Sequence, residues 1–257
     1  MWETVRTIIY AVAIAVVVRT FLYEPFNIPS GSMKPTLLVG DYLFVSKFAY
    51  GYSRHSLPFS PPLGSGRLFG DLPERGDVAV FKLPSNNRTD YIKRIVGLPG
   101  DRIQVREGTL FVNDQEVVRA PIEDFVDDGP AGRMPCRSFL EGGDGATHPV
   151  KRFEETMPAL DGADAPVVYT VLDECPDGDG EYDNTKVFEV PESHVFAMGD
   201  NRDNSLDSRA KVGFVPLENL VGRAEIIFFS TNGSARIWEI WKWPITIRYG
   251  RLFNLID

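Results

Sequence analysis

Residues 24–40 read EPFNIPSGSMKPTLLVG, and the rest of the chain is organised around this stretch. At its centre Ser30 and Ser32 carry two hydroxyls on either side of Gly31. A proline on each side fixes the backbone φ angle, and Gly31 has access to angles that are closed to other residues. Such a segment turns tightly and can hold a serine at a set angle. Alone, it is equally typical of a Ser/Gly/Pro turn that leaves a preceding helix.

An apolar run precedes this stretch. Residues 8–18 read IIYAVAIAVVV, and residues 5–23 extend the run, with one arginine near each end. The longer segment is able to cross a bilayer, because terminal arginines can extend their charged ends to the interface. No small-x-small cleavage pattern follows it. We therefore expect an uncleaved anchor helix that Pro25 ends; a buried helix of a soluble domain is the alternative.

The remaining chain is predicted to be mostly β, because runs rich in aromatic and β-branched residues alternate with turn residues. Residues 51–72 read as a loop, and Leu98-Pro99-Gly100 is typical of a type II turn. Strands are expected at 41–50, 77–83, 91–97, 102–106, 109–113, 115–119, 167–172, 185–190, 194–198, 212–215 and 223–229.

The expected strand at 91–97 carries a lysine in an unusual row. Alternation places Lys93 on the same face as Tyr91 and Ile95. Burial in such a row disfavours the ammonium form, so we expect a lowered pKa for Lys93. The alternative is an ordinary lysine on a solvated strand face.

Three stretches resemble one known family, in the same order. Residues 25–37, PFNIPSGSMKPTL, resemble the nucleophile segment of the bacterial type I signal peptidases (leader peptidases), which cut signal peptides from exported proteins. DYIKRIVGLPGD at 90–101 and GDNRDNSLDSR at 199–209 match two further segments of that family. The resemblance is thin at 52–72 and 120–183.

The resemblance implies a role for each matching polar residue. A serine nucleophile needs a base, and lysine is a recognised alternative to histidine. His55, His148 and His194 all lie outside the three matching stretches. By resemblance Ser32 is the nucleophile and Lys93 the general base. The backbone N–H of Ser32 and the Ser30 hydroxyl match the oxyanion hole, Ser205 matches the residue that orients the lysine, and Asp207 and Arg209 match a supporting ion pair.

The resemblance also implies the substrate. Phe26, Ile28, Leu37 and Ile92 match residues that line the substrate pockets, where bulky apolar walls leave room only for small side chains. The family cleaves exported preproteins after small-x-small sequences such as Ala-x-Ala. Ser32 falls nine residues after Tyr23, which places the expected site near the membrane surface.

The implied architecture is an antiparallel β fold of the kind that signal peptidases share with LexA-type repressors. Residues 1–23 would form a single-pass anchor in the bacterial inner membrane with a cytoplasmic N-terminus. Residues 24–257 would form a catalytic domain on the periplasmic or extracytoplasmic side, with 120–183 as an acidic inserted lobe.

The charge is unevenly distributed along the chain. Residues 121–183 hold 16 acidic and 4 basic side chains, a balance of −12, whereas the whole chain carries −9. The acidity argues against nucleic acid as a partner. The two cysteines, Cys136 and Cys175, lie in this segment without zinc-site spacing, and a disulfide or two free thiols are equally compatible with their positions.

No metal or organic cofactor is implied. The run Asp173–Asp183 departs from a calcium loop, because Cys175 and Asn184 occupy ligand positions. Trp238, Trp241 and Trp243 in the C-terminal tail suit either a membrane interface or a final core strand. Two alternatives for the whole chain stay open: a LexA-type Ser–Lys autoprotease, and an anchored β-domain that binds protein partners without catalysis.

Overall fold

The computed structural model of this chain describes residues 2–57, 60, 64, 66–129, 132–142, 168–173, 180–232, 234 and 238–256, without the side chains of 127–129, 132–135, 140 and 142. The described part is mostly β, as predicted, apart from one long N-terminal helix and a few short helical turns.

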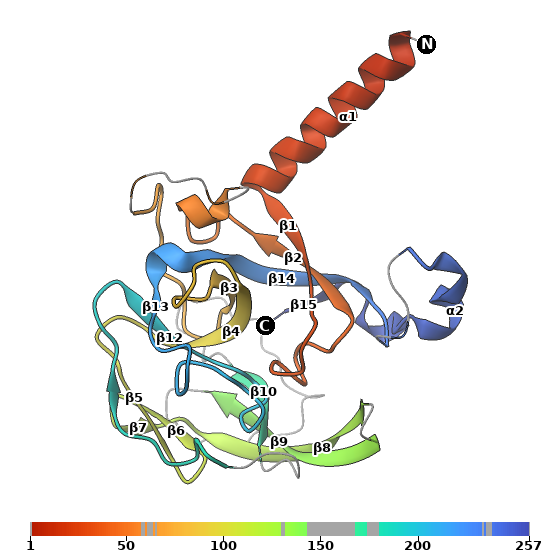
Figure 1. The fold of residues 1–257 in the computed structure, drawn as a ribbon. Helices are drawn as coiled ribbons and strands as arrows, with labels where there is room; N and C mark the ends of the chain where they lie inside the picture. Colours follow the sequence, from red (N-terminus) through yellow and green to blue (C-terminus); the bar gives the residue numbers. More distant parts are fainter. Residues whose placement is uncertain are drawn as a thin grey trace, which may run out of the picture.

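The first element is the helix α1, Trp2–Phe21, which projects away from the sheets (Figure 1). At 1.5 Å per residue it extends about 30 Å, which is the thickness of the hydrocarbon core of a bilayer. Its mean hydropathy is 1.7, and none of its residues is buried. The predicted apolar helix is therefore present, and the alternative of a helix packed inside the domain is wrong.

The helix ends earlier than predicted. Tyr23–Asn27 forms the strand β1, which pairs antiparallel with β2, Asp41–Ser46. Pro25 therefore lies within a strand and does not itself end the helix. The Tyr52 hydroxyl also donates a hydrogen bond to the Phe21 carbonyl at 2.7 Å and satisfies one of the last helical acceptors.

An eight-stranded antiparallel sheet forms the body of the molecule, in the order β1-β2-β14-β3-β4-β12-β13, with β15 paired to β14. Because β14 lies between β2 and β3, a strand from near the C-terminus joins two from the N-terminal half (Figure 1). The remaining bounds are β3 Val78–Lys82, β4 Asp90–Gly97, β12 His194–Met198, β13 Val215–Pro216, β14 Leu220–Ser230 and β15 Asn254–Leu255.

The faces of β4 contribute to different parts of the core. Ile92 packs into the apolar cluster around β1 and β2, whereas Tyr91 and Ile95 pack into a second cluster on the other side. Lys93 lies between them in register and pairs with Ala79 of β3. The predicted alternation along this strand is confirmed.

A second sheet has the order β11-β5-β6-β7 and follows a tight turn. In this turn Gly100 has φ +87°, and the Asp101 N–H donates to the Leu98 carbonyl at 3.0 Å, which confirms the predicted type II turn. The predicted strands are present, although the last three of these are shorter than expected: β5 Arg102–Arg106, β6 Thr109–Val112, β7 Gln115–Glu116 and β11 Phe188–Glu189.

The acidic segment contains more strand than its composition predicted. A third sheet, β10-β9-β8, combines a long hairpin of β8, Arg119–Gly129, and β9, Gly132–Gly142, with β10, Val168–Asp173. Only β10 was expected, because acidic residues are depleted in strands. In β8 the carboxylates of Glu123 and Asp124 are exposed, while Phe125 packs against β10. We call these three strands the ribbon; its hairpin lies at the end of the molecule opposite α1 (Figure 1).

Cys136 of β9 is disulfide-bonded. Cys175, the other cysteine of the sequence, and most of the run Asp173–Asp183 lie outside the described residues.

The C-terminal tail folds into short helical turns and not into a long strand. Trp238 and Trp241 are 63% and 71% exposed, whereas Trp243 packs against Phe229 with ring centroids 4.9 Å apart. The tail thus combines exposed aromatic rings with one that packs on the sheet. Its elements are η3 Ile240–Lys242, α2 Trp243–Thr246 and η4 Tyr249–Arg251; the other short helices are η1 Arg54–Ser56 and η2 Leu217–Asn219.

Candidate active site

The loop between β1 and β2, residues 28–40, carries the two predicted serines, and we call it the serine loop. Ser32 is half-buried, Ser30 is exposed, and their Oγ atoms lie 3.4 Å apart. Met33 and Leu37 follow within the same loop and are 1% and 0% exposed, because they insert into the core below. These two apolar side chains hold the loop against the core and so fix the backbone that carries the two serines.

Lys93 on β4 meets Ser32 across a gap of 61 residues in sequence. Its Nζ donates a hydrogen bond to Ser32 Oγ, and the whole side chain is 3% exposed. The Tyr91 ring lies with its centroid 6.0 Å from Nζ. The structure thus brings together the two residues that the sequence predicts as nucleophile and base.

Burial lowers the pKa of Lys93 to about 8, from an ordinary value of 10.5. The nearby carboxylates of Asp207 and Asp200 oppose this shift, and the Arg209 guanidinium adds to it. Because the desolvation cost of the ammonium dominates, a substantial fraction of Lys93 is neutral near physiological pH. The predicted direction of the shift is confirmed.

The predicted motif at 199–209 lies directly against the serine loop. The Asn201 N–H donates to the Ser32 carbonyl at 3.2 Å, and its side-chain amide donates to the Gly31 carbonyl at 3.2 Å. The Thr36 hydroxyl donates to Asp200 at 2.6 Å. The serine loop is therefore fixed to this motif at its centre and at its end.

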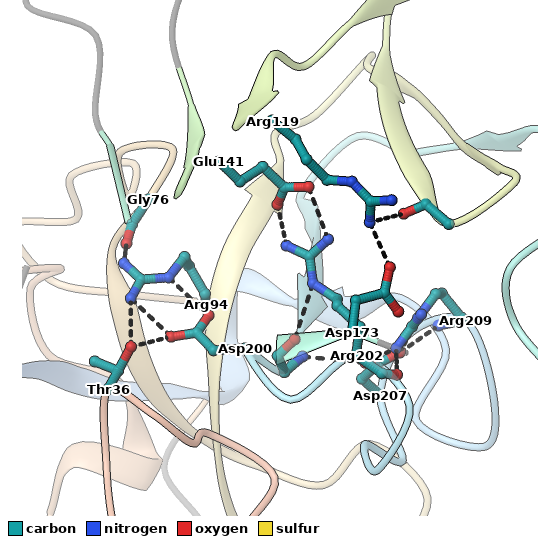
Figure 2. Close-up of polar contacts among 12 residues, drawn as sticks. Thr36, Gly76, Arg94, Arg119, Glu141, Asp173, Asp200, Arg202, Asp207 and Arg209 are labelled. Carbon is teal, nitrogen blue, oxygen red and sulfur yellow. Dashed lines mark hydrogen bonds and ion pairs between the residues drawn. The ribbon is translucent and has the colours of Figure 1, made fainter. Parts of the chain in front are cut away.

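Asp200 also anchors β4 through Arg94, a residue that the sequence analysis placed on the strand without assigning a role. The Arg94 side chain is 0% exposed and forms two hydrogen bonds with the Asp200 carboxylate, at 2.9 and 2.8 Å (Figure 2). A third donor bonds the Gly76 carbonyl at 2.7 Å. This bidentate pair fixes the strand next to the position that bears Lys93. In the sequence, the only signal for this role was that Arg94 directly follows the candidate base, Lys93.

Asp207 and Arg209 form the predicted ion pair, and it is buried (Figure 2). The guanidinium donates two hydrogen bonds to the carboxylate, at 3.0 and 2.9 Å. Burial alone would raise the pKa of the Asp207 carboxyl, but Arg209 and the N–H of Gly199 hold that pKa below its usual range. The carboxylate therefore stays charged and keeps the turn closed.

Ser205 is 4% exposed and lies against Gly199. Its hydroxyl is near enough to the Asp207 carboxylate to help lower the pKa of that carboxyl, yet it forms no hydrogen bond of ordinary geometry among the described residues. No hydrogen bond joins Ser205 and Lys93 in the part of the chain that the structure describes. The orienting role of Ser205 stays a prediction.

The four predicted substrate-binding residues come together in one apolar cluster. Ile28 and Leu37 are buried in it, and Phe26 and Ile92 pack against its edge, half-buried. These side chains come from β1, the serine loop and β4, so the cluster lies beside Ser32 and Lys93. The sequence alone did not show that residues from three elements share one surface.

Within the described ranges, Asp173, Asp183 and Asp203 are the group of carboxylates close enough to share a cation, with ligand atoms within 4.8 Å of one another. Arg119 already pairs with Asp173 (Figure 2). Because this basic side chain compensates the cluster, the structure offers no independent reason to place a metal ion there.

Gly199 allows close approach of the motif to the serine loop. A Cβ atom at this position would lie 2.5 Å from the Ser32 carbonyl oxygen and 2.2 Å from Ser205 Oγ. We expect Gly199→Ala to displace the serine loop and to lower kcat/KM about 10²-fold, the order expected for a misplacement of about 1 Å. Steady-state rates of peptide cleavage would measure this loss in kcat/KM. Gly250→Ala is the matched control, since a Cβ there meets no atom within 4 Å, and equal activity of both variants would contradict the prediction.

A serine whose hydroxyl meets a buried, partly neutral lysine is the arrangement of a hydrolase that uses lysine where other serine enzymes use histidine. This site lies on a β fold that carries an apolar N-terminal helix.

The sequence profile of the family described as "Signal peptidase, peptidase S26" matches residues 1–229 of this chain. The chain is 40% identical over 260 aligned positions to a signal peptidase I of Rickettsia typhi, which covers 95% of this chain and 90% of the relative. It is 39% identical over 264 positions to that of Rickettsia canadensis, with coverages of 97% and 91%. The chain therefore belongs to the signal peptidase family and is a serine peptidase.

Among solved structures, a signal peptidase I from Enterococcus faecalis is 25% identical, with a TM-score of 0.30, and the match covers 60% of this chain and 97% of that chain.

Proposed function

We propose that this chain is a membrane-anchored endopeptidase that removes N-terminal signal peptides from exported preproteins, with Ser32 as nucleophile and Lys93 as general base. The contact between Lys93 Nζ and Ser32 Oγ carries the proposal. Membership of the family supports the reaction, and the lowered pKa of Lys93 supports its role as a base.

The reaction follows from the two protonation states of Lys93. In its neutral form the amine accepts the proton of the Ser32 hydroxyl as Oγ attacks the scissile carbonyl carbon. The tetrahedral intermediate collapses to an acyl-enzyme, and the Lys93 ammonium passes its proton to the leaving amine. Lys93 then accepts a proton from the water that attacks the ester carbonyl, and it returns this proton to Ser32 Oγ as the acyl product leaves.

The backbone N–H of Ser32 and the Ser30 hydroxyl form the proposed oxyanion hole. Ser30 Oγ lies 3.4 Å from Ser32 Oγ and can donate a hydrogen bond to the carbonyl oxygen on which negative charge develops. Among the described residues the Ser32 N–H donates to no acceptor, so it is available to the same oxygen. Donors held in place before the reaction stabilise the negative charge without reorganisation.

The ion pair of Asp207 and Arg209 acts on Lys93 at longer range. The negative charge of Asp207 raises the pKa of Lys93 and the positive charge of Arg209 lowers it, so the pair tunes the base while supporting the turn. In this proposal Ser205, whose buried side chain lies against Gly199, orients Lys93.

The apolar cluster beside the dyad selects the substrate. Phe26 and Ile92 keep part of their surface open at its edge, while Ile28 and Leu37 close its floor. A pocket bounded by these bulky side chains accepts a small residue and excludes a large one. The substrate lies extended against strand edges and is cut after an Ala-x-Ala type sequence.

The helix α1 places the catalytic domain at the membrane. We propose a single span in the bacterial inner membrane with a cytoplasmic N-terminus and the β-domain, residues 24–257, outside. Ser32 and Lys93 together form the proposed dyad. Since only the strand β1 separates α1 from the serine loop, the dyad works near the bilayer surface, where a membrane-embedded signal peptide presents its cleavage site.

The pH dependence of cleavage tests the base directly. Because only neutral Lys93 accepts a proton, kcat/KM is expected to rise with pH and to level off above about 8. Below that value it falls about tenfold per pH unit, since the neutral fraction does so. Initial rates between pH 6 and pH 10 on a fixed peptide measure this limb. A limb near the ordinary histidine pKa of about 6.5 would point to a different base.

Purified protein in detergent and a peptide with one Ala-x-Ala site provide the test of the function. Cleavage after the second alanine is the expected result, and a peptide with leucine at both alanine positions is the control. If the folded protein cleaves neither peptide, also in lipid vesicles, the proposal fails and a non-catalytic, partner-binding domain is favoured. Cleavage of its own chain alone would favour a LexA-type autoprotease.

A further inference from the structure

The acidic ribbon contacts the motif at 199–209 through backbone hydrogen bonds. The Leu172 N–H of β10 donates to the Asp200 carbonyl at 2.8 Å, and the Arg202 N–H donates to the Leu172 carbonyl at 2.8 Å. A parallel bridge between Leu172 and Asn201 results. The strand β10 of the ribbon therefore pairs with the motif that contacts the Ser32 backbone, although the ribbon and the motif are separate in sequence.

A buried ion pair joins the same two parts. Arg202, 4% exposed, donates two hydrogen bonds to the Glu141 carboxylate of β9, which is 0% exposed (Figure 2). Burial alone would lower the pKa of the Arg202 guanidinium, but the charge of Glu141 raises that pKa. Without Glu141 the arginine would be a buried cation that lacks its bidentate partner, which is a costly arrangement.

Arg202 continues this connection toward the reacting serine. Its Nε donates to the Gly199 carbonyl at 3.1 Å, and Arg209 donates to the Arg202 carbonyl at 2.7 Å. The next residue before it, Asn201, donates to the Ser32 carbonyl at 3.2 Å. A continuous set of polar contacts thus leads from Glu141 to the backbone of the nucleophile.

A second contact from the ribbon reaches β4. The ring of Tyr169 on β10 lies 4.2 Å from the centre of the Arg94 guanidinium, over the arginine that clamps Asp200. Tyr169 is 8% exposed and Arg94 is 0% exposed, so the two pack in a desolvated setting where a cation–π contact is strongest. The ribbon therefore supports the strand of Lys93 as well as the loop beside Ser32.

We propose that the ribbon is a positioning element of the active site, in which Glu141 acts through Arg202 and Tyr169 acts through Arg94. This inference rests on the proposed function, since it assigns the ribbon a task in the reaction of Ser32 and Lys93. Neither Glu141 nor Tyr169 lines the apolar cluster that selects the substrate. Their loss should therefore lower kcat and leave KM nearly unchanged.

Glu141→Gln is the decisive variant, because it keeps the shape of the side chain and removes its charge. We expect kcat to fall roughly tenfold to a hundredfold per folded molecule, the range expected when the catalytic geometry is misplaced by up to about 1 Å. Glu123→Gln, at an exposed position on the same ribbon, is the matched control and should keep wild-type kcat. A kcat per folded molecule equal to that of the control overturns the proposal.

Tyr169 supplies a second pair of variants, which decides the matter if Glu141→Gln does not fold. Tyr169→Phe keeps the aromatic face over Arg94, whereas Tyr169→Leu removes it. We expect the Leu variant to lose kcat and the Phe variant to retain it, with the same KM in both. Equal kcat in the two variants would show that the ribbon only fills space.

Amide hydrogen exchange gives a readout that does not depend on activity. In Glu141→Gln the N–H groups of Asn201 and Arg202 should exchange faster than in the wild type, since their acceptors in the serine loop and β10 are no longer held in place. Unchanged protection there overturns the positioning role even if the enzyme proves to cleave another bond. Conversely, faster exchange in Glu141→Gln would support the contact between the ribbon and the motif at 199–209 whatever the reaction is. If the Ser32→Ala variant still cleaved the peptide, the proposed dyad would be refuted independently of that contact.

Discussion

Ser32→Ala is expected to abolish cleavage of the Ala-x-Ala peptide. The change removes the Oγ atom that accepts the hydrogen bond from Lys93, and with it the atom proposed to attack the carbonyl. In a serine peptidase whose catalytic residues act as one unit, deletion of the nucleophile lowers kcat about 10⁶-fold. The fold should persist, because the side chain is half-buried and the loop is held by Met33 and Leu37.

Comparison with Ser30→Ala separates the roles of the two serines. Ser30 is exposed and is proposed to donate to the oxyanion, so its loss should lower kcat about 10²- to 10³-fold and leave measurable turnover. Single-turnover cleavage compares the rates of the two variants, and a thermal melt of each variant shows that it is folded. If Ser32→Ala retains the activity of Ser30→Ala, the nucleophile is a different residue.

Lys93→Met should be as damaging as the loss of the serine. Methionine fills the buried channel of the lysine stem but carries no group that accepts a proton, so the hydroxyl of Ser32 stays protonated and weakly nucleophilic. Because nucleophile and base act as a unit, we expect a loss of about 10⁴- to 10⁶-fold. Lys93→Arg should be equally inactive, since a guanidinium stays charged at every usable pH.

The control for the lysine variants is His194→Ala. The His194 ring contacts the Glu192 carbonyl through Nδ1 at 2.9 Å, at the start of β12, and no role in the reaction is proposed for it. Its activity should equal that of the wild type in the same peptide assay. Loss of turnover in a folded His194→Ala protein, together with residual turnover in Lys93→Met, would reverse the assignment of the base.

The sequence by itself determined the elements whose causes are local. An unbroken apolar run specifies α1, and a proline followed by a glycine specifies the turn at 98–101. Alternation along β4 places Lys93 between Tyr91 and Ile95, which was enough to predict its lowered pKa. The three family-like stretches predicted Ser32 as the nucleophile and Asp207 with Arg209 as an ion pair. The two side chains of this pair are neighbours within one short turn.

Only the tertiary structure decided which distant elements meet. Lys93 reaches Ser32 over 61 residues, and Arg94 reaches Asp200 over 106. The second contact depends on the pairing of β12 with β4, which sets Met198 opposite Arg94 and so brings Asp200, just after Met198, to this strand. Short-range patterns describe the face of a strand but not its neighbour. In the acidic ribbon the exposed carboxylates hid the strand pattern as well, so the buried contact of Glu141 with Arg202 had no sequence counterpart. Its physical basis is burial, which turns a carboxylate from a solvated surface group into the required partner of one particular arginine.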